Sequence, residues 1–316
     1  MAHKLTTKVR FGALLWMART TWDDVLLAAL TAERAGFDDL WVSDHLLPDT
    51  GTADDPVFDG PSILAGLAAS THQIGLGTLV SPISLRHPAL IAKAAVTIDH
   101  ISGGRFTLGL GAGWFESEHT AHDIPFGNTG ERFDRLEAAV PLIRSLVDGH
   151  WTNRSASPFA ITSHQSPARL GSLQILIGGT GERRTLPIVA NYADIWHANG
   201  RLEELVRLSG RVDGLLAAGG RSPQSLARAT NRWVAVRKST SEAVEAIQRT
   251  LDYQHAGEAP KWRLSAGSVD VVARDLMPFV NAGFGSLILS FRAPFDYTTI
   301  ERLPEIRAAL AVNLAA

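Results

Sequence analysis

The amino-acid sequence predicts an α/β protein of the (β/α)8 TIM-barrel class, with insertion segments between some strands and helices. Apolar runs of strand length alternate with amphipathic helical patterns about eight times along the 316 residues. Several of these runs are apolar at every position, which is typical of parallel strands covered on both faces. Because a chain of this length suits one α/β barrel, we expect residues 1–316 to form a single domain.

The first half of the chain contains four predicted strand–helix pairs. Thr21 suits the N-cap of the first helix, and Gly36 follows its last residue. Pro88 stands at a first-turn position of the third helix, whereas Pro141 should kink or interrupt the fourth. We expect strands at residues 9–15, 39–43, 74–80 and 106–111, and helices at 22–35, 61–70, 88–102 and 131–147.

The second half begins with residues 150–172, a stretch rich in Ser, Pro and Thr that we interpret as an insertion loop or short hairpin. Residues 255–267 form a second excursion. Leu186, Val189 and Ala190 mark a helix after the fifth strand. We expect strands at residues 173–177, 193–197, 230–236 and 285–290, and helices at 202–218, 241–253, 269–282 and 300–314.

An open, doubly wound sheet is the competing architecture for alternating strands and helices. Such a fold would carry a G-x-G-x-x-G fingerprint after an early strand. The nearest run is Gly109-Leu110-Gly111-Ala112-Gly113-Trp114, which lacks the third glycine and opens no clear helix. The closed barrel is therefore the prediction.

Composition and charge exclude several classes of function. A net charge of −2 gives no electrostatic reason to expect a nucleic acid or an anionic membrane as a partner. The absence of cysteine excludes disulfides, thiolate metal sites and cysteine nucleophiles. No apolar stretch approaches the roughly 18 residues that span a bilayer, and the first residues lack the apolar core of a signal peptide. We therefore expect a cytoplasmic protein.

The run after the fifth predicted strand has the pattern of a phosphate-binding turn. It reads Ile177-Gly178-Gly179-Thr180-Gly181-Glu182-Arg183-Arg184 and precedes a helix. Glycines let the backbone approach an anion, and the unpaired N–H groups of a first helical turn point at it. The alternative is an ordinary strand-to-helix turn, which also favours glycine.

Polar residues at the ends of other strands are further candidates, because active sites of barrels lie at the C-terminal ends of the strands. The second strand ends in Asp44 and His45, a pair that could supply an acid, a base or a cofactor contact. Alternatively, Asp44 caps the next turn and His45 packs at the rim. Arg86, after the third strand, could hold an anion or be a solvated loop charge.

The fourth strand ends in small residues, Gly111, Ala112 and Gly113, that leave room for a planar ligand. Trp114 follows them directly and could cover such a ligand.

Several titratable residues follow in the same loop. Glu116, Glu118, His119 and His122 do not have the H-E-x-x-H spacing of a metal site, so we expect no metal here. We interpret them as a polar loop with one or two contacts to the active site. His197, at the end of the sixth strand, is a further candidate.

The chain contains no G-x-S-x-G elbow, no Walker A loop and no nucleophile–base signature. It combines glycines, aromatic residues, an Asp–His pair and a phosphate-binding turn. This set suits a redox cofactor that supplies the chemistry while the protein orients it.

Taken in order, these motifs resemble those of the luciferase-like monooxygenase superfamily, whose members have the bacterial-luciferase-like TIM barrel. The similarity covers most of the chain and is weakest over residues 200–267. It is carried by Val9-Arg10-Phe11-Gly12, Ala32-Glu33-Arg34-Ala35-Gly36-Phe37, Leu40-Trp41-Val42-Ser43-Asp44-His45, Gly75-Leu76-Gly77-Thr78, Arg86-His87-Pro88-Ala89, Ile98-Asp99-His100-Ile101-Ser102-Gly103-Gly104-Arg105, the run from Gly109 to Trp114, Gly130-Glu131-Arg132-Phe133, the run from Ile177 to Glu182 and Tyr192-Ala193-Asp194-Ile195-Trp196.

Within that superfamily, the Asp44-His45 pair and the glycine turn resemble the branch that uses the deazaflavin coenzyme F420. The resemblance implies a flavin-like cofactor in the barrel mouth, with Asp44 among its contacts. Its phosphate would meet the backbone N–H groups of Gly178, Gly179 and Thr180.

The resemblance also implies where the redox-active ring would lie. A non-proline cis peptide between Leu79 and Val80 would back the central ring, and Ala112 and Gly113 would also contact the cofactor. His45 matches the family histidine beside the reactive carbon.

The identity of the catalytic acid departs from the family pattern. Some F420-dependent relatives place a glutamate where this chain has Trp114. The nearest carboxylate here is that of Glu116, which we take as the candidate acid.

The resemblance implies an F420-dependent oxidoreductase that transfers a hydride between the coenzyme and a small organic substrate, and a homodimer. One alternative is an FMN-dependent monooxygenase that receives reduced flavin from a separate reductase. A second is a non-catalytic protein that binds and carries the cofactor. A cofactor-free hydrolase is disfavoured by the missing nucleophile and metal sets.

Overall fold

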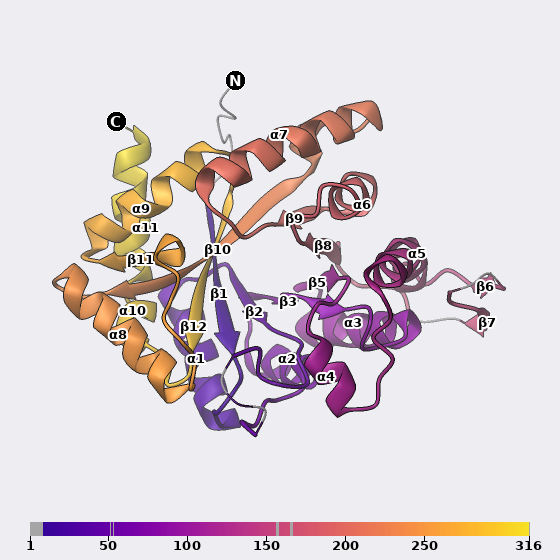
Figure 1. Cartoon of the computed structure of the whole chain (residues 1–316), viewed down its shortest axis with the longest axis horizontal. Coiled ribbons are helices and arrows are strands. Elements are labelled where there is room, and N and C mark those ends of the chain that lie inside the picture. The colour runs from indigo at the N-terminus through magenta and orange to yellow at the C-terminus, as the bar shows by residue number, and fades with distance from the viewer. Residues whose placement is uncertain (1–8, 51, 53, 156–157, 165–166, 316) are drawn as a thin grey trace.

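We analysed a computed structural model of the chain, which describes residues 9–50, 52, 54–155, 158–164 and 167–315. Eight of its strands form a closed parallel ring, and helices surround that ring (Figure 1). The predicted (β/α)8 barrel is therefore confirmed. The ring consists, in spatial order, of β1 (Arg10–Trp16), β2 (Asp39–Val42), β3 (Gly75–Thr78), β5 (Phe106–Gly111), β8 (Gln174–Gly178), β9 (Ile195–His197), β10 (Ala227–Val236) and β12 (Ser286–Arg292).

β10 is long enough to pair with two strands along the same edge. Its first residues pair with β9, and residues from Trp233 onward pair with β11 (Leu264–Gly267). On its other side β10 pairs with β12, and β12 pairs with β1, which closes the ring. The predicted excursion at residues 255–267 therefore ends in a strand that the sequence did not reveal.

Helices follow the strands and cover the outside of the ring. They are α1 (Trp22–Ala35), α2 (Gly60–Ser70), α3 (Pro88–Ser102), α4 (Glu116–Ala121), α5 (Thr129–Val147), α6 (Thr185–Tyr192), α7 (Leu202–Ala218), α8 (Thr240–Tyr253), α9 (Val269–Asn281), α10 (Tyr297–Ile300) and α11 (Leu303–Ala315). No helix in the described part of the chain is long and apolar enough to cross a membrane.

The ends of these helices follow from local chemistry. The Thr21 side chain accepts a hydrogen bond from the N–H of Asp24, and Gly36 ends α1 in the left-handed conformation (φ 83°). Asn128 and Glu131 form a reciprocal capping box at the start of α5. Of the two outcomes expected at Pro141, a kink or a break, the break was wrong, because α5 continues through that residue.

The predicted insertion at residues 150–172 contains a short antiparallel hairpin of β6 (Thr152–Arg154) and β7 (Ile161–His164). In Figure 1 this hairpin lies at the right edge of the molecule, beyond α5 and away from the ring of strands. The insertion therefore lies outside the barrel.

The two largest apolar cores of the described residues lie on either side of the barrel wall. A large core lies between the strands and the helices that cover them. A smaller one fills the inside of the ring with side chains of β1, β2, β8, β10 and β12, namely Leu14, Trp41, Leu176, Ala229 and Ile288. The barrel interior is therefore filled, which leaves the C-terminal ends of the strands as the place for a ligand.

Candidate functional site

A cavity of about 770 Å³ opens at the C-terminal ends of the barrel strands. This volume lies within the range of small-molecule and cofactor pockets. Most of the residues that the sequence nominated line this cavity, namely His45, Leu79, Val80, Ala112, Gly113, Gly178, Gly179 and Thr180. Asp44 and Glu116 do not line it.

His45, at the end of β2, is held by a carboxylate from α4. Its Nδ1 lies 3.2 Å from Oε2 of Glu118, and the same oxygen accepts a hydrogen bond of 2.8 Å from the N–H of Leu46. Glu118 is buried, with 1% of its side chain exposed. Burial disfavours the charged imidazolium, but the hydrogen bond and charge of Glu118 outweigh it, so the pKa of His45 lies above its ordinary value.

Glu118 therefore occupies the position for which the sequence had suggested Glu116. Glu116 is the first residue of α4 and is exposed, whereas Glu118 lies two residues later on the face toward His45. The short helix was not apparent from the sequence, so nothing distinguished the two carboxylates. Trp114 and Phe115 each lie edge-on to the His45 ring at 6.0 Å between centroids, and Trp114 is largely exposed at the cavity mouth.

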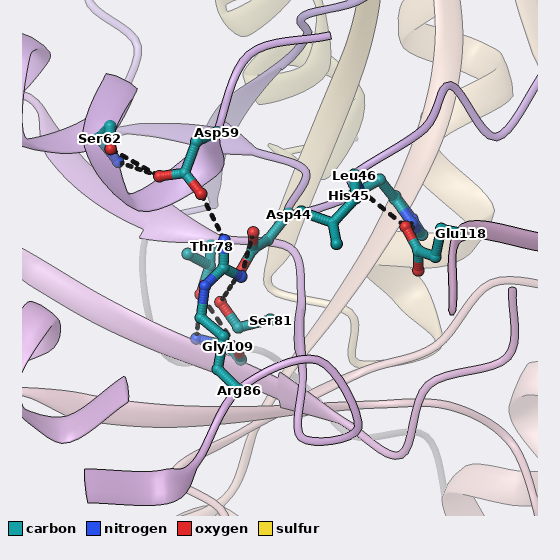
Figure 2. Close-up of polar contacts among 10 residues, drawn as sticks. All are labelled: Asp44, His45, Leu46, Asp59, Ser62, Thr78, Ser81, Arg86, Gly109 and Glu118. Atoms are coloured by element: carbon teal, nitrogen blue, oxygen red, sulfur yellow. Dashed lines mark hydrogen bonds and ion pairs between the residues drawn. The ribbon is translucent and has the colours of Figure 1, made fainter. Parts of the chain in front are cut away.

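Asp44 and His45 are adjacent in the chain, but their side chains point to opposite sides of the loop after β2. Figure 2 shows Asp44 directed toward Arg86 and Ser81, while His45 meets Glu118. Nη1 of Arg86 lies 2.7 Å from both carboxylate oxygens of Asp44, and Ser81 donates to Asp44 at 2.7 Å.

This buried ion pair explains why neither partner lines the cavity. Asp44 is fully buried, and burial raises its pKa even though Arg86 lies beside it. Nη2 of Arg86 also contacts Asp59, the N-cap residue of α2. The interpretation of Arg86 as an anion-binding residue therefore does not fit, because Arg86 pairs with two carboxylates outside the cavity. Asp44 instead positions the loop that carries His45.

The wall between β3 and β8 is built around a non-proline cis peptide. The bond joins Leu79 and Val80, as the resemblance implied. A Cβ atom on Gly111 would lie 2.8 Å from a Val80 methyl carbon, and one on Gly178 would lie 3.1 Å from another. The absence of side chains at both positions lets Val80 lie against the ends of β5 and β8 and form part of the cavity wall.

Two hydrogen bonds hold Gly179, at the centre of the glycine turn after β8. The N–H of Gly179 donates to the carbonyl of His197, and its own carbonyl accepts a hydrogen bond of 2.8 Å from Nε1 of Trp196. At φ 129° the Gly179 backbone is one that residues with a side chain rarely adopt. Because the Gly179 N–H is engaged, it is not free for a phosphate. Thr180 and Gly181 line the same cavity, and their backbone N–H groups have no such bond to another described residue.

The predicted helix starts later than the glycines. A turn at residues 182–184 separates them from α6, whose first residue is Thr185. Thr185 packs beneath the turn and lines the cavity. Arg183 is exposed and does not line the cavity.

A second histidine, His197 at the end of β9, lies beside this turn in a polar chain. Nδ2 of Asn231 donates to Ser290 at 3.0 Å, so Oδ1 of Asn231 is left to accept from Nε2 of His197 at 3.1 Å. Burial lowers the pKa of His197 to about 4. His197 is therefore neutral near pH 7, with its proton on Nε2 and a lone pair on Nδ1.

One side of the cavity is formed by the segment that follows α8. Gln254 is buried and its side-chain amide donates to the carbonyls of Ala18 and Ala293, at 3.0 and 2.6 Å. At the other end, Arg232 contacts the carbonyls of Trp262 and Leu264. Between these two anchors lie four residues that line the cavity, Ala256, Gly257, Glu258 and Pro260.

Arg263, Arg292, Trp16 and Trp233 complete the cavity wall, and sequence reasoning missed all four. They come from distant positions and share no local motif, so only the ring of strands brings them together. The described residues contain no cluster of three or more His, Asp or Glu side chains placed to hold a metal ion.

Comparisons with known proteins place this architecture among related enzymes. The chain is 31% identical over 264 residues to an F420-dependent hydroxymycolic acid dehydrogenase of Mycobacterium tuberculosis, covering 82% of this chain and 68% of that protein. Among solved structures, an F420-dependent secondary alcohol dehydrogenase in complex with an F420-acetone adduct has a TM-score of 0.83 and 17% identity, over 96% of this chain and 99% of that one.

A third similar protein is a monooxygenase component. It is the oxygenating constituent of 3,6-diketocamphane monooxygenase of Pseudomonas putida, in complex with FMN, with a TM-score of 0.77 and 14% identity over 96% of this chain and 99% of that one. At these identities the solved structures establish the fold alone. The profile of the luciferase-like monooxygenase family matches residues 5–274. The chain belongs to the luciferase-like monooxygenase family.

Proposed function

We propose that this protein is an F420-dependent oxidoreductase that transfers a hydride between the deazaflavin and a small organic molecule. The observation that carries the proposal is one cavity that brings together a glycine turn, a wall shaped by Val80 and the His45–Glu118 pair. The similarity to an F420-dependent dehydrogenase over most of the chain supports F420 as the cofactor.

The cavity fits a large planar cofactor with a phosphate. Its volume is about 770 Å³, and it is lined by Thr180 and Gly181, whose backbone N–H groups have no partner in the part of the chain that the structure describes. When bound, F420 would supply a carbon that accepts or donates hydride. The chain supplies the binding surface and the proton chemistry.

In this proposal His45 holds the proton that accompanies hydride transfer. Its Nδ1 is occupied by Glu118, which leaves Nε2 free to exchange a proton with an oxygen of the substrate. A pKa above the ordinary value favours the protonated form of His45, which can donate a proton; its neutral form accepts a proton in the reverse direction. Glu118 takes the role that the sequence suggested for Glu116.

The glycine turn is tested by a matched pair of variants, Gly181→Asp and Gly181→Asn. Both add a side chain of similar size next to Thr185, but only Asp adds a negative charge beside the proposed phosphate. We expect Gly181→Asp to weaken F420 binding at least tenfold relative to Gly181→Asn, measured by titration of the coenzyme absorbance. Equal affinities would contradict a phosphate at this turn.

FMN is the second candidate cofactor, because the FMN-bound 3,6-diketocamphane monooxygenase shares the fold. A deazaflavin carries carbon where a flavin has its oxygen-reactive nitrogen, so the two cofactors predict different reactions. Difference spectra after adding each oxidised cofactor to the purified protein separate them. Tight FMN binding with oxygen-dependent turnover and no F420 binding would replace the proposal, and F420 binding without turnover of any substrate would indicate a carrier.

A further inference from the structure

Four buried N–H groups on one wall of the cavity have no hydrogen-bond partner among the described residues. They are Nε1 of Trp16, Nε1 of Trp233, Nε of Arg263 and Nε of Arg292. Trp233 and Arg292 are more than nine-tenths buried, at 8% and 7% exposure. Leaving a buried donor unpaired is unfavourable by roughly 1–3 kcal/mol for a neutral group and more for a charged one. Four such donors on one wall indicate that a bound ligand accepts hydrogen bonds from them.

The donors form one stacked group. The guanidinium carbon of Arg292 lies 4.2 Å from the Trp16 ring centroid and 5.4 Å from that of Trp233. The guanidinium of Arg263 lies 5.3 Å from the same Trp233 ring. Two cations therefore share one indole, which holds their planes in place.

The positive charge of this group is incompletely neutralised by the protein. The Arg263 side chain makes no hydrogen bond or ion pair to any described residue, although it is mostly buried. Arg292 donates to Thr50 at 2.7 Å, and its nearest carboxylate, Asp49, is 3.5 Å away. Burial lowers the pKa of both arginines, and the charge of Arg292 lowers that of Arg263 further. A negative charge in this position would relieve both effects.

The group lies across the barrel mouth from the glycine turn. Trp16 and Arg292 are paired residues at the ends of β1 and β12, and Trp233 lies on the adjacent β10. The glycine turn follows β8, which stands opposite β1 in the ring. His45 follows β2, beside β1, so it is next to this wall. A substrate held here would therefore lie between the wall and the proposed cofactor, with its reactive end near His45.

We propose that this wall binds an anionic oxygen group, a carboxylate or a phosphate, carried by the substrate. Such groups accept several N–H bonds at once and match the fork of donors that arginine presents. That the bound anion belongs to the substrate rests on the proposed function; that the wall binds an oxyanion does not. The substrate class is then a small organic acid or organic phosphate that also carries the carbon to be oxidised or reduced.

The proposal is tested first without any coenzyme, by titrating the protein with inorganic phosphate and with benzoate while recording tryptophan fluorescence. Trp16 and Trp233 report directly on the site, because an anion that accepts their N–H groups alters their emission. We expect saturable binding of at least one anion. The preferred anion tells a phosphate ester from a carboxylic acid as the substrate type.

Variants then locate the binding site. Arg263→Met and Trp16→Phe should weaken anion binding at least tenfold and about threefold, because each removes donors while keeping bulk. Arg292→Met should act like Arg263→Met if it folds; the other two variants do not depend on it. Arg211→Met, which removes an exposed charge on α7, is the matched control and should leave binding unchanged.

Two further comparisons separate the outcomes. The affinity of Arg263→Met for F420 should stay within twofold of that of the parent protein. If this variant instead loses F420 binding and anion binding equally, the wall binds the coenzyme and the assignment to the substrate is wrong. Loss of anion binding in Gly181→Asp but not in Arg263→Met would place the anion at the glycine turn and refute the proposal. The absence of saturable binding of either anion would refute it as well. Anion binding by a protein that binds no F420 would reject the proposed function alone.

Discussion

At the scale of single residues, the carboxylate two positions after the predicted one changes how the site is understood. Glu118 is buried against His45, while Glu116 is exposed on the same short helix. These two glutamates provide an internal comparison, because the same substitution at each removes the same charge from α4. Only one of them should affect the proton chemistry.

Glu118→Gln should therefore lower turnover on the order of tenfold or more, since positioned proton transfer contributes about 10²–10⁴ in rate. Removing the carboxylate charge lowers the His45 pKa. The pH at which the rate changes with His45 protonation should accordingly move to lower pH in either reaction direction. The measurement is the pH dependence of kcat, together with the His45 titration by NMR. Glu116→Gln is the control, and equal profiles for the two variants would remove Glu118 from the mechanism.

His197 gives a second residue-scale prediction, this time for stability. Its pKa is about 4 in the folded protein, against about 6.5 for an ordinary histidine. The unfolded chain therefore takes up a proton between pH 6.5 and 4 that the folded protein refuses, and the free energy of unfolding falls as the pH falls through this window. The loss attributable to His197 is roughly 3 kcal/mol.

His197→Gln retains an N–H donor for Asn231 but cannot titrate, so it should lose less stability on acidification than the parent protein. Urea unfolding at pH 7 and at pH 4.5 measures the difference. His150→Gln, at an exposed histidine, should behave like the parent. A parallel acid dependence in all three proteins would contradict the assignment.

At the scale of secondary-structure elements, a side chain of α1 holds the turn between α2 and β3. Oε1 of Glu33, on α1, accepts the N–H groups of His72, Gln73 and Ile74, at 2.8, 2.7 and 3.1 Å. Burial opposes the charged form, but these three donors outweigh it and the pKa of Glu33 is lowered. The carboxylate thus fixes the turn that leads into β3.

Glu33→Ala should lower the free energy of unfolding by about 1–3 kcal/mol, because three backbone donors lose their acceptor. The loss should shrink as the pH falls and Glu33 becomes protonated in the parent protein. Chemical denaturation at pH 7 measures it. Glu245→Ala, which removes an exposed ion pair with Arg249 on α8, should change stability by less than about 0.5 kcal/mol.

The elements also show what could be predicted from the sequence. α1, α7 and β5 have the predicted bounds, because caps and periodicity are local signals. β11 and α4 were missed, since four and six residues are too few to show a period. The helix through Pro141 shows packing overriding a local preference.

The same distinction applies to the site. The glycine turn and the Asp44-His45 pair are short local motifs, and the sequence located both. The direction of Asp44 toward Arg86, away from the cavity, depends on a contact 42 residues away. The arginine–tryptophan wall depends on the pairing of β1, β10 and β12, so no window of sequence contains it.

At the scale of the whole molecule, the mouth of the barrel has two separate groups of hydrogen-bond donors, and we propose that each binds an anion. The glycine turn offers backbone donors on one side, and the arginine–tryptophan wall offers buried cations on the other. Salt screens charge attraction between exposed groups more strongly than between buried ones. The two regions should therefore differ in their response to ionic strength.

We expect F420 affinity to fall as sodium chloride is raised from 50 to 500 mM, because salt screens part of the attraction between the protein and the anionic tail of the coenzyme. Affinity of the wall for its preferred anion should fall less, once competition by chloride is corrected with a sodium gluconate series. Isothermal titration measures both. A steeper loss at the wall than for F420 would contradict its burial.

The segment between Gln254 and Trp262 has a consequence for how this protein could change over evolution. It is tied to the barrel at both ends by side chains that hold backbone carbonyls, and these contacts use no side chain of residues 256–261. Four residues of this segment, Ala256, Gly257, Glu258 and Pro260, nevertheless line the cavity. Substitutions at these few positions can therefore change the substrate preference during evolution. They leave the barrel and the proposed proton-transfer pair, His45 and Glu118, unchanged.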